Sequence, residues 1–274
     1  MRAVKAKLVI FTDLDSTLLD HRSYSFEKAR EALELIYKEN IPFIFCTSKT
    51  RPETEFWREK MNNYHPFIVE NGAAIYIPEG YFPFHVPGAR NFSTYHLLEL
   101  GQPYEKLRQF LLFCRQHLAP SVRGFGDMTL EEIMFLTGLS ADMASLAIQR
   151  EYDEPFIVQE EKELSLIQRE AARAGYKILT GSRFHHLTGG NDKGQAVRLL
   201  QYLYTKFFGA ILSAGIGDSH NDLAMLEAVD RPFLVQKDDG SYDPEVKVSG
   251  LWFASGIGPQ GWKEAVFFLL KNLE

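Results

Sequence analysis

The sequence has few cysteines and no long apolar run near its N-terminus. Cys46 and Cys114 are its two cysteines, and a chain of 274 residues does not need disulfides to hold its fold. Two free thiols in a reducing compartment are therefore expected. The first apolar run extends from Leu8 to Phe11, which is too short for a signal peptide or a membrane span. These absences predict a cytoplasmic protein with no membrane partner.

The sequence also lacks an excess of positive charge. Its net charge is −6 at neutral pH, whereas proteins that grip nucleic acids present clustered Lys and Arg to the phosphate backbone. Nucleic acid is therefore not an expected partner, although a small anionic substrate needs only a local positive pocket. We find neither an internal repeat nor a low-complexity segment, and the 45% hydrophobic and 13% aromatic content is typical of a packed globular protein.

The order of apolar segments predicts an α/β fold with a Rossmann-like parallel sheet. Short apolar runs, typical of buried parallel strands, alternate with helical patterns in the first part of the chain and again in the last third. Such alternation places helices on both faces of one sheet. Strands are expected at 8–11, 41–46, 210–215 and 233–235, a hairpin at 67–77, and helices at 26–36, 50–62, 194–207, 222–229 and 261–273.

The middle of the chain has a different pattern. Longer amphipathic segments at 103–118, 129–137 and 160–174 alternate there with short extended ones. We predict an inserted α+β unit at residues 85–187. Residues 1–84 and 188–274 would then form one sheet domain.

Two carboxylates directly follow the first expected strand, in Asp13-Leu-Asp-Ser-Thr17. Ligands of open α/β sheets bind at the carboxyl ends of the strands, and two acids this close suit a hard divalent cation. A calcium loop also begins Asp-x-Asp-x-Thr, but it requires Gly and Glu where this chain has Leu18 and Tyr24. Taken alone, the acids could instead cap a helix.

A second pair of carboxylates follows the strand at 210–215. Gly215 and Gly217 allow a tight turn and a close approach of the backbone. Asp218 and Asp222 are four residues apart, so they share a face if a helix has begun, and they can then serve one cation. Ordinary helix capping is the alternative for these two residues as well.

Polar and basic residues open two further helices. Thr47 ends the strand at 41–46, and a hydroxyl beside a helix N-terminus is an anion site. Lys49 and Arg51 near that positive helix end are unfavourable unless an anion offsets them, and Lys193 is similarly placed before the helix at 194–207. Solvated surface charge is the alternative for each of these cations.

Taken in this order, the four segments resemble the signature motifs of the haloacid dehalogenase phosphatases. The inserted unit is similar to the larger α+β cap of the Cof-like sugar phosphatases in that superfamily. One departure is Ser16, where most relatives carry Gly. Further similarity to the mannosyl-3-phosphoglycerate phosphatases spans nearly the whole chain, in Thr47-Ser-Lys-Thr50, Glu70-Asn-Gly72, Met128-Thr-Leu-Glu-Glu-Ile133, Thr137-Gly138, Gly181-Ser-Arg-Phe-His-His-Leu187, Asp192-Lys-Gly194 and Gly258-Pro-Gln-Gly-Trp262.

The resemblance implies a phosphatase that works through an aspartyl-phosphate. Asp13 would attack phosphorus, and Asp15 would protonate the leaving alkoxide and then activate water. Thr47 and Lys193 would bind the phosphoryl oxygens.

The resemblance also implies Mg²⁺ as the cofactor. Its protein ligands would be the Asp13 carboxylate, the backbone carbonyl of Asp15 and Asp218. Asp222 would act through a bound water or by orienting Asp218.

The cap would determine the substrate, a small phosphorylated sugar or sugar acid. Arg183 can bind a carboxylate or phosphate with two hydrogen bonds. Adjacent histidines on a strand point to opposite faces, so His185 and His186 cannot both face one ligand. The expected substrate-binding residues are Ser48, Lys49, Asn71, Arg183 and His185.

The expected reaction is hydrolysis of mannosyl-3-phosphoglycerate to mannosylglycerate and phosphate. The sequence leaves open another sugar-phosphate phosphatase, acting on glucosyl-3-phosphoglycerate or sucrose phosphate, and a phosphomutase. A non-catalytic sugar-phosphate sensor is a hypothesis of another class, disfavoured because a binding protein does not need both Asp13 and Asp15. The oligomeric state cannot be inferred from the sequence.

Overall fold

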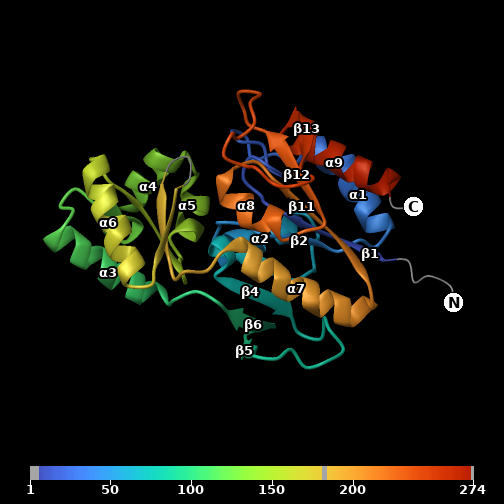
Figure 1. Cartoon of the computed structure of the whole chain (residues 1–274), viewed down its shortest axis with the longest axis horizontal. Helices are drawn as coiled ribbons and strands as arrows, with labels where there is room; N and C mark the ends of the chain where they lie inside the picture. Colours follow the sequence, from blue (N-terminus) through green and yellow to red (C-terminus); the bar gives the residue numbers. More distant parts are fainter. Residues whose placement is uncertain (1–5, 181–183, 273–274) are drawn as a thin grey trace.

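The structure is a computed structural model that describes residues 6–180 and 184–272. Neighbouring strands of the central five-stranded sheet are all parallel, and their order across the sheet is 13-12-11-1-2 (Figure 1). The predicted α/β fold is thus confirmed, and the strand at residues 252–257 is a further one that was not predicted, at one edge of the sheet. The strands are β1 (Lys7–Thr12), β2 (Phe43–Phe45), β11 (Ile211–Gly217), β12 (Arg231–Gln236) and β13 (Trp252–Ile257).

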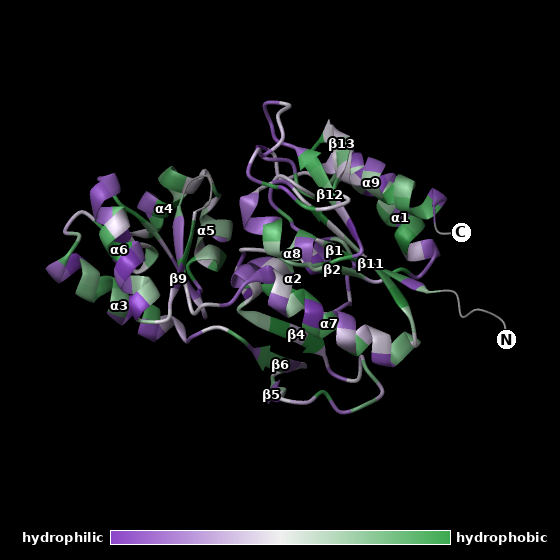
Figure 2. Ribbon diagram, viewed as in Figure 1, coloured by the Kyte–Doolittle hydropathy of each residue, from purple (hydrophilic) through white to green (hydrophobic). Residues whose placement is uncertain are grey.

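Helices cover both faces of this sheet. Leu8 and Ile10 of β1 join the hydrophobic cluster on one face, and Val9 and Phe11 join the cluster on the other. A strand buried on both sides needs apolar residues at successive positions, which explains its continuous apolar run. Figure 2 shows hydrophobic residues along the central strands. The covering helices are α1 (Arg30–Lys38) and α9 (Pro259–Lys271) on the first face, and α7 (Lys193–Phe208) and α8 (Leu223–Glu227) on the second.

A second, antiparallel sheet extends from the edge of the first. A bridge between Cys46 and Ile68 connects the two sheets. Its strands are β3 (Phe67–Val69), β4 (Ala74–Pro78), β5 (Arg90–Phe92) and β6 (Tyr95–Glu99), in the order β3-β4-β6-β5.

The strand β6 pairs with β4, although the insertion was predicted to start earlier, at residue 85. Residues 90–99 continue the sheet of the 67–77 hairpin, so we propose that they belong to the core. The strand β5 is largely exposed and carries no alternating apolar pattern. For this reason no hydrophobic pattern indicated that the sheet continued.

The remaining middle segment forms a separate layer beside the core (Figure 1). Its own hydrophobic cluster includes Leu107, Leu111, Phe156 and Ile167. We propose residues 103–188 as the cap. The strands of its antiparallel sheet, in the order β7-β8-β10-β9, are β7 (Arg123–Gly124), β8 (Asp153–Ile157), β9 (Lys177–Thr180) and β10 (His185–Thr188), and its helices are α3 (Tyr104–His117), α4 (Leu130–Thr137), α5 (Ala141–Ala147) and α6 (Glu161–Arg173).

Two expectations about the compartment can be compared with the structure. Cys46 and Cys114 are both free and buried. Within residues 6–180 and 184–272, none of the helices combines the length and the apolar composition that crossing a membrane requires.

Candidate active site

Three acidic side chains meet at the carboxyl end of the central sheet. Thr12 of β1 lies beside Ile216 of β11, so these parallel strands end at the same level. Asp13 and Asp218 follow them directly, and Asp222 lies on the turn after β11. One carboxylate oxygen from each of the three residues lies within 4.8 Å of the other two. The structure therefore brings together acids that are separated by about 200 residues in sequence, as the strand-end argument predicts.

Lys193 lies among these acids rather than in solvent. Its Nζ donates to Asp13 Oδ1 at 2.8 Å and to Asp222 Oδ1 at 2.6 Å, and the lysine side chain is 1% exposed. One cation does not neutralise three buried carboxylates. Burial raises the pKa of Asp13 to about 7 although Lys193 lowers it, and burial together with Asp222 raises the pKa of Asp218. A further cation would relieve this excess of buried negative charge.

The hydrogen bonds indicate which acids could hold that cation. Both oxygens of Asp222 are engaged, Oδ1 by Lys193 and Oδ2 by the backbone N–H groups of Asp218 at 3.0 Å and Ser219 at 3.3 Å. Thr17 donates to Asp218 Oδ1 at 3.1 Å. Among the described residues, no donor contacts the other oxygen of Asp13 or of Asp218. The free oxygen of Asp218 and one oxygen of Asp13 therefore fit a hard cation such as Mg²⁺, whereas the contacts of Asp222 favour its role in orienting Asp218.

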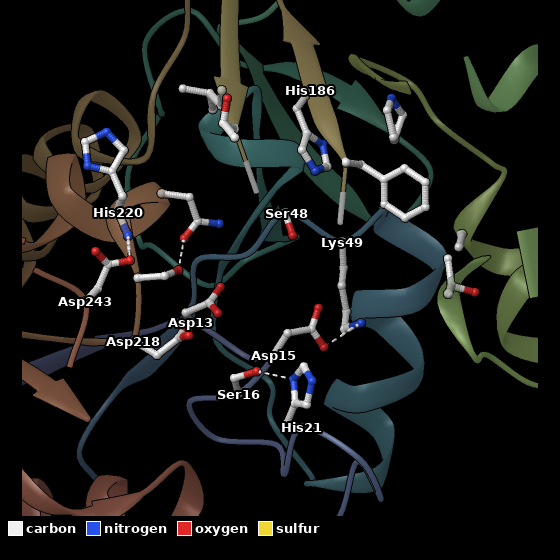
Figure 3. A pocket seen from close by; sticks show the side chains of 18 of the residues that line it. Asp13, Asp15, Ser16, His21, Ser48, Lys49, His186, Asp218, His220 and Asp243 are labelled. Carbon is white, nitrogen blue, oxygen red and sulfur yellow. Dashed lines mark hydrogen bonds and ion pairs between the residues drawn. The ribbon is translucent and has the colours of Figure 1, made fainter. Parts of the chain in front are cut away.

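Asp15 lies next to Asp13 but has a different environment. Its side chain is 40% exposed, and Lys49 Nζ lies 2.9 Å from its Oδ1 (Figure 3). Lys49 is buried and also pairs with Glu53 at 3.5 Å in α2 (Arg51–Lys60). The lysine at this helix start is therefore offset by two carboxylates. We predicted Lys49 as a substrate-binding residue, and it does line the cavity, but its contacts indicate that it orients Asp15.

Ser16 has a backbone conformation that favours glycine. Its φ is +59°, in the left-handed region that favours Gly. The Ser16 hydroxyl lies 2.9 Å from His21 Nδ1, so the turn is held by a side-chain contact that glycine cannot make.

Thr47 and Asn71 connect the segment Thr47-Ser-Lys-Thr50 to the turn after β3. The backbone N–H of Asn71 donates to the carbonyl of Thr47 at 3.0 Å, and the Thr47 hydroxyl accepts from the N–H of Lys49 at 3.2 Å. The side chain of Asn71 donates to Asp153 Oδ2 of the cap at 3.2 Å and does not line the cavity. The prediction that Asn71 contacts substrate therefore does not fit its position, because it joins the core to the cap.

A cavity of about 970 Å³ separates these motifs from the cap. Asp13, Asp15, Ser48 and Lys49 line it from the core (Figure 3). Ser48, a predicted substrate-binding residue, is thus placed in the cavity lining, and its contact with substrate stays a prediction. Cap residues that line the cavity include Phe125, Arg150, Phe184 and His186.

The cap residues differ from those expected. His186 lines the cavity, whereas His185 lies on the other face of β10 beside Phe156, 3.2 Å from Thr180 Oγ1. We predicted His185, and the sequence could not distinguish the two faces of this strand. Arg183 lies outside the described residues. Arg150 was missed because it belongs to a loop without a motif.

Comparisons with known proteins agree with this architecture. Residues 10–109 match the family model of the haloacid dehalogenase-like hydrolases. A solved subclass IIB sugar phosphatase of this superfamily aligns with a TM-score of 0.64 at 14% identity, covering 97% of this chain and 98% of that one, which supports the fold alone.

Two curated relatives are much closer in sequence. The chain is 43% identical to the glucosyl-3-phosphoglycerate/mannosyl-3-phosphoglycerate phosphatase of Methanococcoides burtonii, over 96% of its own length and 97% of the relative's. It is 40% identical to the mannosyl-3-phosphoglycerate phosphatase of Pyrococcus furiosus, over 83% of its length and 90% of the relative's. The chain therefore belongs to the mannosyl-3-phosphoglycerate phosphatase family of the haloacid dehalogenase-like hydrolases.

Proposed function

We propose that this protein is a Mg²⁺-dependent phosphatase that hydrolyses a glycosyl-3-phosphoglycerate through a phosphoryl group carried on Asp13. The observation that carries the proposal is the arrangement around Asp13. One of its oxygens is held by Lys193 at 2.8 Å, and the residue lines a cavity beside Asp15. A nucleophilic carboxylate and a neighbouring acid are the two groups that this chemistry requires.

In the first step, the unengaged oxygen of Asp13 attacks phosphorus opposite the leaving oxygen. The bond between phosphorus and the glycerate oxygen breaks, and Asp15 donates a proton to that oxygen. In the second step, Asp15 takes a proton from a water molecule, which attacks the phosphorus of the aspartyl-phosphate. Inorganic phosphate leaves, and the Asp13 carboxylate is restored.

The surrounding charges position these two acids. Bound Mg²⁺, held by Asp13, Asp218 and the Asp15 backbone, would neutralise the phosphoryl oxygens and the carboxylates that approach them. Lys193 fixes Asp13 Oδ1, the oxygen that would also ligate Mg²⁺, which leaves the other oxygen of Asp13 free to attack. Lys49 Nζ, 2.9 Å from Asp15 Oδ1, holds the Asp15 side chain in place for both steps. Thr47, between β2 and α2, is proposed to donate its hydroxyl proton to a phosphoryl oxygen, although its side chain is buried and does not line the cavity.

The substrate assignment depends on the relatives. Their names include both mannosyl-3-phosphoglycerate and glucosyl-3-phosphoglycerate, so we propose the mannosyl compound as the main substrate and the glucosyl compound as a second one. The two buried free cysteines support a reducing, cytoplasmic location.

A phosphate-release assay tests this proposal. Mannosyl-3-phosphoglycerate, glucosyl-3-phosphoglycerate and sucrose phosphate are each incubated with enzyme and Mg²⁺, and then with a chelator. We expect release to be fastest from the two glycerates and to stop on chelation. Faster release from sucrose phosphate would overturn the glycerate assignment, and tight binding without release from any ester would indicate a sensor.

A further inference from the structure

The cap contributes a histidine that a buried carboxylate holds in place. His186 Nδ1 lies 2.7 Å from Asp153 Oδ2, and Asp153 is fully buried. Figure 3 shows the His186 ring directed into the hollow, across from Asp13 and Asp15. Because Asp153 accepts at Nδ1, the Nε2 atom is the ring nitrogen left for a ligand. When both ring nitrogens carry a proton, the ring donates Nδ1–H to Asp153 and can offer Nε2–H to an anion.

Arg150 lines the same cavity from the loop between α5 and β8. Its side chain is 7% exposed, with Nε donating to the Ala147 carbonyl at 2.9 Å and Nη1 to the Ser48 carbonyl at 2.8 Å. Glu53 Oε2 lies 4.0 Å from Nη2, too far for a hydrogen bond, and no other described residue accepts from that nitrogen. The buried guanidinium is thus hydrogen-bonded at two atoms, its Nη1 also lies 3.6 Å from Asp153 Oδ2, and its Nη2 keeps its hydrogens for a ligand.

The charges along the cavity are unevenly distributed. Arg150, His186 and Lys177 belong to the cap side, whereas the core loop that lines the cavity has one cation and four acids: Lys237, Asp238, Asp239, Asp243 and Glu245. An incoming carboxylate is repelled by the acidic loop and attracted by the guanidinium. Sugar hydroxyls, in contrast, can donate to carboxylates.

We infer that Arg150 and His186 form a subsite that binds the carboxylate of the substrate's glycerate moiety. The inference rests on the proposed function and deepens it, because it fixes the orientation of the substrate. With the phosphoryl group at Asp13, the carboxylate lies against Arg150 and His186. Asp153 is a positioning residue, since it acts through His186.

The test compares two esters that differ at one group. The first is mannosyl-3-phosphoglycerate, and the second is mannosylglycerol 3-phosphate, in which a CH₂OH group replaces the carboxylate. We expect His186→Gln and Arg150→Lys to lower kcat/KM for the first ester by about 10- to 100-fold, as expected for a lost charge-assisted hydrogen bond. The second ester should change by less than about threefold. His185→Gln, on the opposite face of the same strand, is the matched control and should leave the ratio of the two rates unchanged.

Equal losses on both esters would overturn the subsite and assign these residues to the packing of the cap. A second measurement is independent of the natural substrate: inhibition of p-nitrophenyl phosphate hydrolysis by mannosylglycerate and by mannosylglycerol. Preferential inhibition of wild type by the acid, lost in His186→Gln, supports the subsite even if neither glycosyl-3-phosphoglycerate is hydrolysed. Equal inhibition by the two compounds contradicts it.

Discussion

At the scale of single residues, the site is defined by an excess of buried negative charge. Asp13, Asp218 and Asp222 surround one lysine, and two of their oxygens face no donor among the described residues. Lys193 cannot offset all three acids, so a bound divalent cation should stabilise the folded protein as well as support catalysis.

This excess of charge leads to a prediction for Asp218→Asn. Wild type should gain about 2.7 kcal/mol of stability when free Mg²⁺ is a hundredfold above its dissociation constant. The variant should lose most of that gain, and in a chelator it should be at least as stable as wild type, because one repelling carboxylate is gone. Thermal unfolding with Mg²⁺ and with chelator measures both effects. The same Mg²⁺-dependent gain in both proteins would exclude Asp218 as a ligand.

The residues that could be predicted are those whose position follows from a strand end. Asp13 and Asp218 had to lie close together once their strands were taken as parallel. The cap residues offered no such rule, because His185 and His186 alternate on a strand whose buried face the sequence does not reveal. Arg150 reaches the cavity through a loop conformation that no local pattern encodes.

At the scale of elements, the turn after β3 is packed against the start of α7. A Cβ at Gly72 would lie 2.2 Å from the carbonyl oxygen of Asp192 and 2.7 Å from the backbone nitrogen of Lys193. The close approach of these backbones holds Lys193 beside Asp13. Gly80 also has a positive φ, +73°, but a Cβ there would meet no atom within 4 Å.

Comparing Gly72→Ala with Gly80→Ala separates the clash from backbone strain. Both variants adopt a left-handed conformation, which costs about 1–2 kcal/mol. Gly72→Ala should cost a further 1–3 kcal/mol, roughly, through overpacking, and it should lower kcat because Lys193 moves. Chemical denaturation and p-nitrophenyl phosphate turnover test this. Equal stability and activity in the two variants would contradict the proposed packing.

The elements themselves were predictable where hydrophobic pattern and strand order agree. The parallel sheet follows from apolar runs that each precede a helical pattern. The strand β5 could not be predicted from such a pattern, because its exposed residues are stabilised by pairing with β6 rather than by burial.

At the scale of the whole molecule, acid stability should depend on a histidine far from the cavity. Burial, with Arg58 nearby, lowers the pKa of His65 from 6.5 to about 4. The ring packs against Phe43, and its Nδ1 lies 2.7 Å from the Tyr81 hydroxyl. In the folded state the imidazole therefore stays neutral at mildly acidic pH.

The sign of the pH dependence follows from the lowered pKa. The unfolded chain binds a proton at His65 near pH 6.5, and the folded protein binds it only near pH 4. Stability from this group is thus complete above pH 6.5 and falls by about 1–3 kcal/mol as the pH drops toward 4. His65→Gln should be less stable than wild type at pH 7 and should lose less stability between pH 7 and 4.5. An unchanged acid-dependent loss in the variant would exclude His65 as its source.

The central claim about the molecule is that Asp13 carries the phosphoryl group. The most direct measurement uses Asp15→Asn, which keeps the nucleophile but lacks the base that activates water. With p-nitrophenyl phosphate, whose leaving group needs little protonation, the variant should release about one nitrophenol per enzyme molecule in a rapid burst and then turn over slowly. Mass spectrometry of the acid-quenched variant should locate the phosphoryl group on Asp13, and Asp13→Asn should show neither burst nor label. A phosphoryl group on another residue, or steady turnover by Asp13→Asn at wild-type rate, would contradict the account.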